Sequence, residues 1–140
     1  MPNARGVLFD LPDVIASADV EHVRLKKRPG DFFVDSLPRA DAYVLMEVIH
    51  DWADAQCVAI LKSIRDAAPD SGTVLIIENV LPDDELDPRG QILDAIMLTV
   101  TGGRERTPSQ LNALLNTAGF SQGAVIETAG PLRIVEASAV

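Results

Sequence analysis

Four side chains that could do acid, base or hydrogen-bonding chemistry follow or end apolar runs of this sequence. Asp10 closes "VLFD", Asp31 lies in "PGDFF", His50 closes "YVLMEVIH", and Glu78 lies in "VLIIENV". In an open parallel α/β sheet, ligands bind beyond the carboxyl ends of the strands. The sequence therefore predicts that these acids and the histidine gather at one edge of a sheet and form a site there.

His50 is the member of this set best suited to proton transfer. An imidazole titrates near pH ~6.5, so its neutral form can accept a proton close to neutral pH. Such a base needs a neighbouring acid to orient the ring, and Glu78 and Glu105 are the candidates. By residue type alone, a histidine at a strand end is more often structural, and Glu105 between two arginines could be an ordinary surface ion pair.

The two aspartates each allow two interpretations. Asp10 could accept hydrogen bonds from a ribose diol, as acids at this place do in nucleotide-binding α/β folds, or it could cap a short helix after Pro12. Asp31 could accept from the amino group of an adenine stacked near Phe32 and Phe33, or it could be a turn residue beside two core aromatics. Position leaves both interpretations open for Asp10 and favours the turn for Asp31.

Alternation of short apolar runs with helical patterns predicts a parallel α/β sheet, covered on both faces. Helices are expected to start near Asp54, which could be an N-cap, near Pro88, and at Pro108, with a shorter one after Pro12. Thr107 and Gln110 have the spacing of a capping box. The expected strands are residues 6–9, 23–26, 42–49, 73–80, 124–128 and 132–137, with the last two as a possible antiparallel hairpin at one edge.

Two further helix features follow from the pattern. Gly119 suits the end of the helix that starts at Pro108. The helix that starts near Pro88 is expected to present one apolar face, made of Ile92, Leu93, Ile96, Met97 and Val100.

Composition argues against several classes of protein. With 140 residues the chain can bury the core of one domain, and its net charge of -9 would repel a nucleic-acid backbone. A single cysteine, Cys57, excludes an intramolecular disulfide, and no Cys/His cluster indicates a metal. No apolar run approaches the roughly 20 residues that cross a bilayer, and the first residues do not read as a signal peptide. A cytoplasmic protein with no nucleic acid or membrane partner is the prediction.

Seven segments, taken in order, resemble a known family. They are "FDLP", "GDFF", "LMEVIHDWAD", "VLIIENVLP", "DAIML", "GGRERT" and "LLNTAGF". This series is similar to class I S-adenosylmethionine-dependent O-methyltransferases, of the type that acts on phenolic and polyketide-like small molecules. The resemblance runs from about Arg5 to Val140, and the pair "HDWAD" with "GGRERT" is its most specific part.

For the cofactor, the resemblance implies S-adenosyl-L-methionine. It implies that Asp10, with Leu11 beside it, holds the ribose, that Asp31 meets the adenine amino group, and that Phe32 packs on the ring. Met46 occupies a position where many members of the family have a lysine against the cofactor, so one contact is lost or replaced.

For the acceptor, the resemblance implies that His50 is the general base for a hydroxyl group, flanked by Glu78 and Glu105. Deprotonation of a phenol, whose pKa is about 10, would accompany methyl transfer. The remaining implied positions form the cofactor or acceptor wall and the acceptor pocket: Asp51, Trp52, Asp94, Met97 and Leu98.

The resemblance also implies what this sequence lacks. The expected fold is α/β, a Rossmann-like methyltransferase sheet without its first strand and glycine-rich loop, so residues 1–140 form a single partial catalytic domain without the family's amino-terminal dimerisation domain. The gap left in the sheet could be closed by direct pairing of the Val7 strand with the Val44 strand, by a partner chain, or by homo-oligomerisation.

Three functions are compatible with these features. The first is an O-methyltransferase portion with a small-molecule hydroxyl acceptor, expected to be weak or inactive by itself. The second is a non-catalytic methyltransferase-like remnant that binds a partner or self-assembles. The third is another nucleotide-binding α/β protein, in which Asp10 holds a ribose and His50 is structural.

Overall fold

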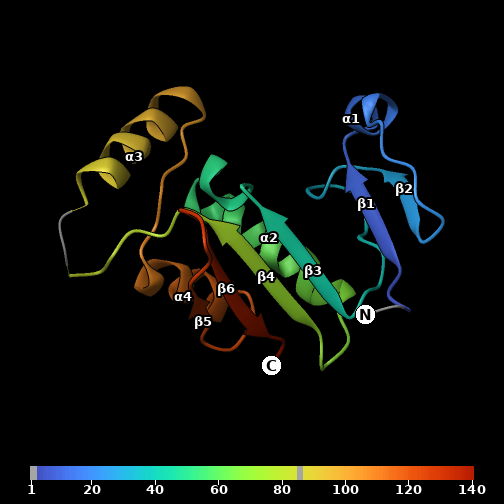
Figure 1. Cartoon of the computed structure of the whole chain (residues 1–140). Coiled ribbons are helices and arrows are strands. Elements are labelled where there is room, and N and C mark those ends of the chain that lie inside the picture. The colour runs from blue at the N-terminus through green and yellow to red at the C-terminus, as the bar shows by residue number, and fades with distance from the viewer. Residues whose placement is uncertain (1–2, 85–86) are drawn as a thin grey trace. The chain divides into compact units, whose positions relative to one another are not determined.

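A computed structural model of the chain describes residues 3–84 and 87–140. It divides into two compact units, Met1–Pro38 and Arg39–Val140, each with a sheet of its own. Figure 1 shows the elements of both units.

The amino-terminal unit is built on two parallel strands. β1 (Gly6–Asp10) pairs with β2 (Leu25–Pro29), and helix α1 (Pro12–Ser17) lies between them in the sequence. The second strand therefore starts two residues later than expected and runs to Pro29. Gly30 follows it closely against β1, since a Cβ on Gly30 would lie 2.5 Å from the ring of Phe9. Parallel pairing brings the carboxyl ends of both strands to the same edge of this sheet.

The carboxy-terminal unit holds a four-stranded sheet in the order β3-β4-β6-β5. β3 (Ala42–Met46) and β4 (Thr73–Glu78) are parallel, whereas β6 (Arg133–Ser138) runs antiparallel to both β4 and β5 (Ala124–Ile126). The sheet is therefore mixed rather than parallel. The expected antiparallel hairpin at one edge is confirmed, with β5 as the edge strand.

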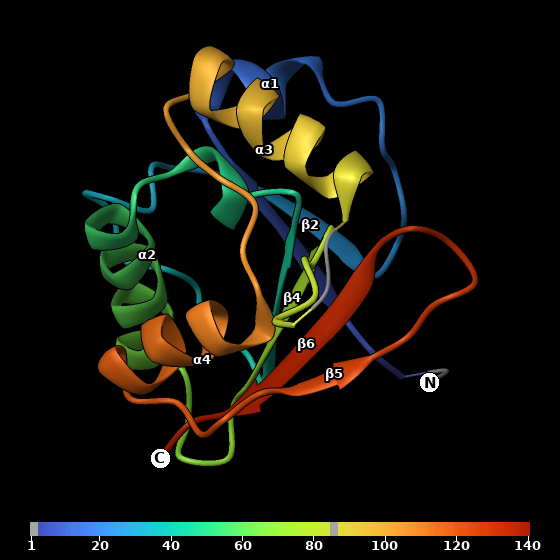
Figure 2. The same cartoon turned by 90° about the vertical axis from the view of Figure 1, so that its left-hand side faces the viewer.

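One face of this sheet carries the core. The register places Tyr43, Val74 and Ala137 side by side, followed by Leu45, Ile76 and Val135. Helices α2 (Asp54–Ala67) and α4 (Pro108–Thr117) lie on one side of the strands, as Figure 2 shows. Each large aliphatic side chain buried there stabilises the fold by about 1.5–3 kcal/mol. The buried helix residues are Cys57, Ile60, Leu61, Ile64, Leu111, Leu114 and Leu115.

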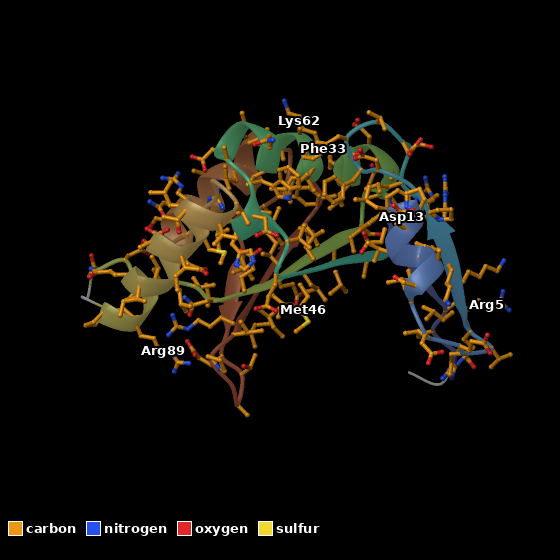
Figure 3. All side chains as sticks on the ribbon, turned by 90° about the horizontal axis from the view of Figure 1, so that it is seen from above. Arg5, Asp13, Phe33, Met46, Lys62 and Arg89 are labelled. Carbon is orange, nitrogen blue, oxygen red and sulfur yellow. The ribbon has the colours of Figure 1, made fainter. Side chains whose placement is uncertain are left out.

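The opposite face of β3 is open. Val44 and Met46 point to this face and are more than half exposed, at 59% and 56%. Figure 3 shows Met46 on the side of the sheet away from Lys62, which lies on α2. The expectation that this strand is covered on both faces is wrong, because α2 and α4 both lie on one side of it.

Helix α3 (Pro88–Val100) begins as a capped helix, with the Asp87 side chain accepting from the backbone N–H of Arg89 at 3.1 Å. Only part of its expected apolar face is buried. Leu93 and Met97 are half-buried, whereas the other three members are exposed: Ile92, Ile96 and Val100. Within the described ranges, no helix is long and apolar enough to cross a membrane.

The helix-end predictions had mixed outcomes. The capping box of Thr107 and Gln110 is present, and Gly119 adopts a φ of +87° directly after the end of α4, which favours glycine. Asp54 is not an N-cap, because Ala53 occupies that position and Asp54 is the first helical residue. Its carboxylate instead pairs with two arginines that follow α3 in the sequence.

The direct pairing expected between the strands of Val7 and Val44 is wrong. Val7 pairs with Lys26 in one sheet, and Val44 pairs with Leu75 in the other. Because β3 ends its sheet, one row of its backbone groups has no strand partner in the described parts of the chain. A strand added from another chain remains compatible with this edge.

Candidate active site

His50 is carried by a short 3-10 helix rather than by the end of a strand. β3 stops at Met46, where the expected strand over residues 42–49 ran on to Ile49. Glu47 takes a left-handed φ of 53°, which ends the extended backbone and directs the chain into η1 (Ile49–Asp51). His50 is the central residue of η1 and lies one tight turn beyond the sheet.

Glu78, the last residue of β4, holds the main chain of η1. Its Oε1 accepts the backbone N–H of Ile49 at 2.6 Å and that of His50 at 3.1 Å. The Glu78 side chain is only 2% exposed, and its carboxylate oxygen provides a hydrogen-bond acceptor for these two backbone N–H groups in the interior of the unit. The Glu78 carboxylate thus fixes the position of the His50 backbone, from which the imidazole side chain extends.

Glu105 approaches the ring itself. Its Oε1 lies 3.4 Å from His50 Nδ1, and both side chains are largely buried. This distance fits an ion pair but is longer than a good N–H···O hydrogen bond. Burial raises the pKa of Glu105, and the nearby His50 opposes that rise. Nδ1 faces Glu105, and the other ring nitrogen, Nε2, lies 3.7 Å from Asp51 Oδ1.

The loop that carries Glu105 is fastened at two points. The backbone N–H of Glu105 donates to Asp94 Oδ1 at 2.9 Å, and that of Arg104 donates to the carbonyl oxygen of His50 at 2.8 Å. Asp94, predicted to line an acceptor pocket, thus positions the acid beside the histidine.

Gly103 makes the close approach of this loop possible. A Cβ at this residue would lie 1.9 Å from the carbonyl oxygen of His50 and 2.5 Å from the carbonyl carbon of Asp51. Both are main-chain atoms, so no side chain could rotate away. Only glycine fits between the loop and η1.

Arg106 is a buried residue that connects the loop of Gly103 and Glu105 to η1. It is 1% exposed, and its Nη1 donates to the carbonyl of Ile49 at 3.1 Å while Nη2 donates to that of Trp52 at 2.7 Å. Nη2 also pairs with Asp54 Oδ1 at 2.9 Å. The sequence pattern indicated Gly103 only as part of a helix end and Arg106 only as a surface charge beside Glu105. Both lie in "GGRERT", the segment whose occurrence together with "HDWAD" is the most specific part of the resemblance. Their contacts give the physical reason for that coincidence.

Cys57, on α2, also contacts the main chain of η1 and of the residue that follows it. Its thiol lies 3.3 Å from the carbonyl oxygens of Ile49 and Trp52 and can donate to either. Burial raises the pKa of Cys57 to about 11, so the thiol stays protonated near neutral pH and acts as a donor rather than a nucleophile.

A cavity of about 600 Å³ opens beside His50. His50, Glu105 and Asn79 contribute polar groups, and residues of α3, of the segment after β4 and of the turn before β6 supply apolar surface: Val80, Pro82, Leu93, Met97, Pro131 and Leu132. The charged residues that complete the lining are Glu47, Asp87, Arg89 and Arg133. This volume suits a small organic molecule.

The structure groups some of the predicted acceptor-side residues and separates others. Met97 lines the cavity with His50 and Glu105. Asp51 and Trp52 adjoin His50 at the end of η1, whereas Leu98, on α3, is exposed.

The predicted cofactor-side residues of the amino-terminal unit lie at adjacent strand ends. Asp10 Oδ1 accepts the backbone N–H of Leu11 at 2.7 Å, and Leu11 is the exposed N-cap of α1, without a side-chain cap. The helix-cap alternative for Asp10 is therefore not observed. Asp31 Oδ1 accepts the backbone N–H of Phe33 at 2.8 Å, which is the turn arrangement. The ring of Phe32 lies edge-on to that of Phe33, with centroids 4.8 Å apart.

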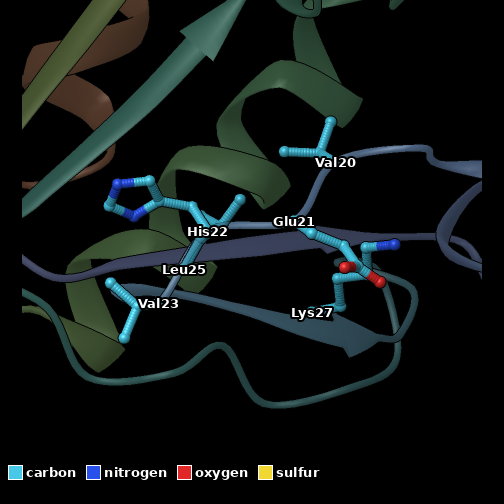
Figure 4. Close-up of a pocket in the computed structure, with 6 residues that line it drawn as sticks. All are labelled: Val20, Glu21, His22, Val23, Leu25 and Lys27. Atoms are coloured by element: carbon cyan, nitrogen blue, oxygen red, sulfur yellow. The ribbon is translucent and has the colours of Figure 1, made fainter.

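A second hollow in this unit carries none of the predicted site residues. It is open, lined by β2 and the segment before it, and Figure 4 shows its residues: Val20, Glu21, His22, Val23, Leu25 and Lys27. His22 Nδ1 accepts the backbone N–H of Arg24 at 3.1 Å, so this histidine belongs to a local turn.

The buried carboxylate of Glu78 predicts a pH-dependent stability. Burial raises its pKa from 4.5 to about 7 against the opposing effect of the His50 N–H. Between these values the folded chain holds a proton that the unfolded chain has released, so raising the pH favours unfolding. The variant Glu78→Gln keeps an acceptor oxygen but cannot titrate. When the pH rises from 4.5 to 8, the free energy of unfolding of the unaltered chain should therefore fall by on the order of 3 kcal/mol more than that of the variant.

Urea unfolding at both pH values, followed by the fluorescence of Trp52, measures this difference. Glu136→Gln on β6 is the matched control, because Glu136 is exposed. An equal pH dependence in all three proteins would contradict the assignment to Glu78.

The fold and the histidine–acid site define the class of protein. Residues 1–121 match the family model described as the O-methyltransferase domain, and the chain therefore belongs to that family. The family resemblance drawn from the seven sequence segments is confirmed.

Particular relatives sharpen this assignment. The chain is 42% identical over 125 residues to acetylserotonin O-methyltransferase of Bos taurus, covering 85% of this chain and 36% of the relative. It is 41% identical over 143 residues to phenazine O-methyltransferase PhzM of Lysobacter antibioticus, covering 97% of this chain and 42% of the relative. The chain thus spans well under half of the length of these relatives.

A solved structure agrees with the fold. The crystal structure of human N-acetylserotonin methyltransferase in complex with S-adenosylmethionine matches with a TM-score of 0.93 and 34% identity, over 99% of this chain and 41% of that one. The expected α/β methyltransferase fold is confirmed, and so is S-adenosylmethionine as a cofactor of the family.

Proposed function

We propose that this chain supplies the acceptor-side machinery of an S-adenosylmethionine-dependent O-methyltransferase. The reaction transfers a methyl group to a hydroxyl of a small aromatic or polyketide-like molecule. The observation that carries the proposal is the buried pair of His50 and Glu105 on the wall of a cavity of about 600 Å³.

The chemistry of this chain's residues is a proton transfer. The acceptor's O–H bond breaks as Nε2 of His50 takes the proton, and the oxygen keeps the electron pair with which it forms a bond to the methyl carbon. S-adenosylmethionine, when bound, would supply that methyl group from a positively charged sulfur, and the electron pair of the broken carbon–sulfur bond would remain on the sulfur of S-adenosylhomocysteine. Glu105 stabilises the imidazolium at Nδ1, while Glu78 and Asp94 keep the base and the acid in place.

The amino-terminal unit offers groups that fit the nucleoside part of the cofactor. Asp10 and Asp31 end or follow two parallel neighbouring strands, and each accepts one backbone N–H through Oδ1. A carboxylate offers about four acceptor positions, so each retains capacity for a ribose diol or an adenine amino group. We assign the ribose to Asp10 with Leu11, and the adenine to Asp31 with Phe32. Met46, which cannot donate a hydrogen bond, leaves the family's lysine contact unfilled.

The proposed partners follow from the same features. The acceptor is a small molecule, and the unpaired edge of β3 takes up a strand from a second copy of the chain, in a cytoplasmic homo-oligomer. We keep the wall assignment for Asp51 and Trp52 and the acceptor-pocket assignment for Asp94, Met97 and Leu98.

Titration calorimetry of the chain with S-adenosylmethionine and S-adenosylhomocysteine tests the proposal. Micromolar binding supports an enzyme. Millimolar or absent binding favours the alternative, a non-catalytic methyltransferase-like module that binds a partner or assembles with itself.

This chain is expected to be weak or inactive by itself, so His50→Ala in an intact version of the enzyme tests the base separately from cofactor binding. Removing a general base lowers the rate of methyl transfer to a phenol by about 10²- to 10⁴-fold. Cofactor affinity should stay unchanged, because His50 is assigned to the acceptor. His22→Ala, at an exposed histidine outside the cavity, is the matched control. Full activity of His50→Ala would refute its role.

A further inference from the structure

We propose that Asn79 determines acceptor specificity by donating a side-chain hydrogen bond to a second oxygen of the acceptor. The cavity would then select aromatic molecules that carry a hydrogen-bond-accepting oxygen besides the reacting hydroxyl. This inference rests on the proposed function and adds a substrate class to it.

The main chain holds Asn79 firmly at the cavity wall. It directly follows Glu78, whose carboxylate fixes the backbone of His50. It directly precedes Val80, which forms a bridge with Arg106, the buried arginine under η1. A main chain held on both sides in this way restricts where the Asn79 amide can lie, which favours a specificity contact.

The Asn79 amide has an unused donor. Its Nδ2 is buried and has no hydrogen-bond partner among residues 3–84 and 87–140. An unmade hydrogen bond of this kind costs about 1–3 kcal/mol, so buried donors are nearly always satisfied by protein, water or ligand. Two other buried polar atoms in the described chain share this condition, His50 Nδ1 and Glu105 Oε2. All three belong to residues that line the same cavity.

These three atoms divide into two groups by chemistry. His50 Nδ1 lies 3.4 Å from Glu105 Oε1, so this carboxylate can satisfy the imidazole when the two close to hydrogen-bonding distance, and Oε2 belongs to the same carboxylate. Asn79 is left over, and an amide N–H can only donate. Its complement is therefore an oxygen that accepts, such as a carbonyl, an ether or a second hydroxyl.

The other walls supply the rest of the recognition. Leu93, Met97 and Leu132 offer apolar surface, which suits a flat aromatic body. A site built to hydrogen-bond a ligand oxygen discriminates against an analogue without it, because its own polar group stays unpaired.

Binding of 2,3-dihydroxynaphthalene and 2-naphthol to the whole chain, by calorimetry, tests the inference. The two probes share one hydroxyl and the aromatic body, and only the first has a second oxygen. We expect the diol to bind about 10-fold more tightly, as one good hydrogen bond provides. Asn79→Leu, of similar size, should reduce this preference to about 1-fold by weakening only the diol. Asn116→Leu, at an exposed asparagine of α4, should keep it.

Each other outcome is decisive. If the preference persists in Asn79→Leu, or if that substitution weakens both probes equally, the role of Asn79 is overturned while the cavity stands as an aromatic site. If neither probe binds at millimolar concentration, the acceptor site of the proposed function fails as well. Asn79→Ser, which still carries a donor, should retain part of the preference, and it keeps the test valid should the leucine variant not fold.

Discussion

Replacing Gly103 by alanine should disrupt η1 and lower the free energy of unfolding by about 3 kcal/mol or more, the range of severe backbone and packing conflicts. The added Cβ would lie 1.9 Å from the carbonyl oxygen of His50, where real Cβ atoms do not occur. Relief requires the loop and η1 to separate. Separation breaks the hydrogen bond from the Arg104 N–H to His50 and moves the Glu105 side chain away from the imidazole.

Urea unfolding followed by fluorescence measures this loss, and Trp52, the chain's single tryptophan, adjoins η1 and reports on it directly. Gly102→Ala is the matched control. Gly102 has a φ of +78° but nothing within 4 Å of the site of a Cβ, so alanine there should cost only the left-handed strain of about 1–2 kcal/mol. Equal losses in the two variants would show that crowding against His50 is not what demands glycine.

Replacing Arg106 by methionine should cost about 3–5 kcal/mol of unfolding free energy, as expected when one partner of a buried charged network is removed. The substitution removes the guanidinium donor from the carbonyl oxygens of Ile49 and Trp52, which keep only weaker donors such as the Cys57 thiol. It also leaves the Asp54 carboxylate with one arginine instead of two. Because both lost carbonyl contacts belong to the ends of η1, the emission of Trp52 should shift in the folded protein as well.

Arg104→Met separates the buried contacts of Arg106 from the ion pair with Asp54. Arg104 shares the same carboxylate, but its side chain is 44% exposed. An exposed pair of this kind contributes about 1 kcal/mol or less. If both methionine variants lost the same stability, the main-chain contacts of Arg106 would have no special weight.

The helices and the sequence of strands along the chain were predictable, because apolar periodicity and capping chemistry are local, whereas the pairing of the strands was not. The capping box at Thr107 and the closing turn at Gly119 follow from residue type and spacing. The end of β3 was not predictable in this way. "YVLMEVI" looks like one continuous apolar run. The left-handed backbone that interrupts it lies at Glu47, and such a conformation is predictable mainly where the residue is glycine.

Within the candidate site, residue types indicated which side chains matter but not which atoms they contact. Glu78 was expected beside the histidine ring and instead accepts from the main chain of Ile49 and His50. Arg106 reads as a surface charge among polar neighbours, yet it is buried because three carbonyl oxygens converge on it. Long-range contacts between main-chain atoms leave no pattern in a single sequence.

The way η1 is held has an evolutionary consequence. Glu78, Gly103 and Arg106 hold η1 through contacts with its main chain, whereas α3 and the turn before β6 supply much of the apolar wall of the cavity. Mutations in that wall can therefore accumulate without displacing His50. Related chains could diverge in the shape of the cavity by drift and selection on the wall alone, with the arrangement of His50 and its two acids inherited intact.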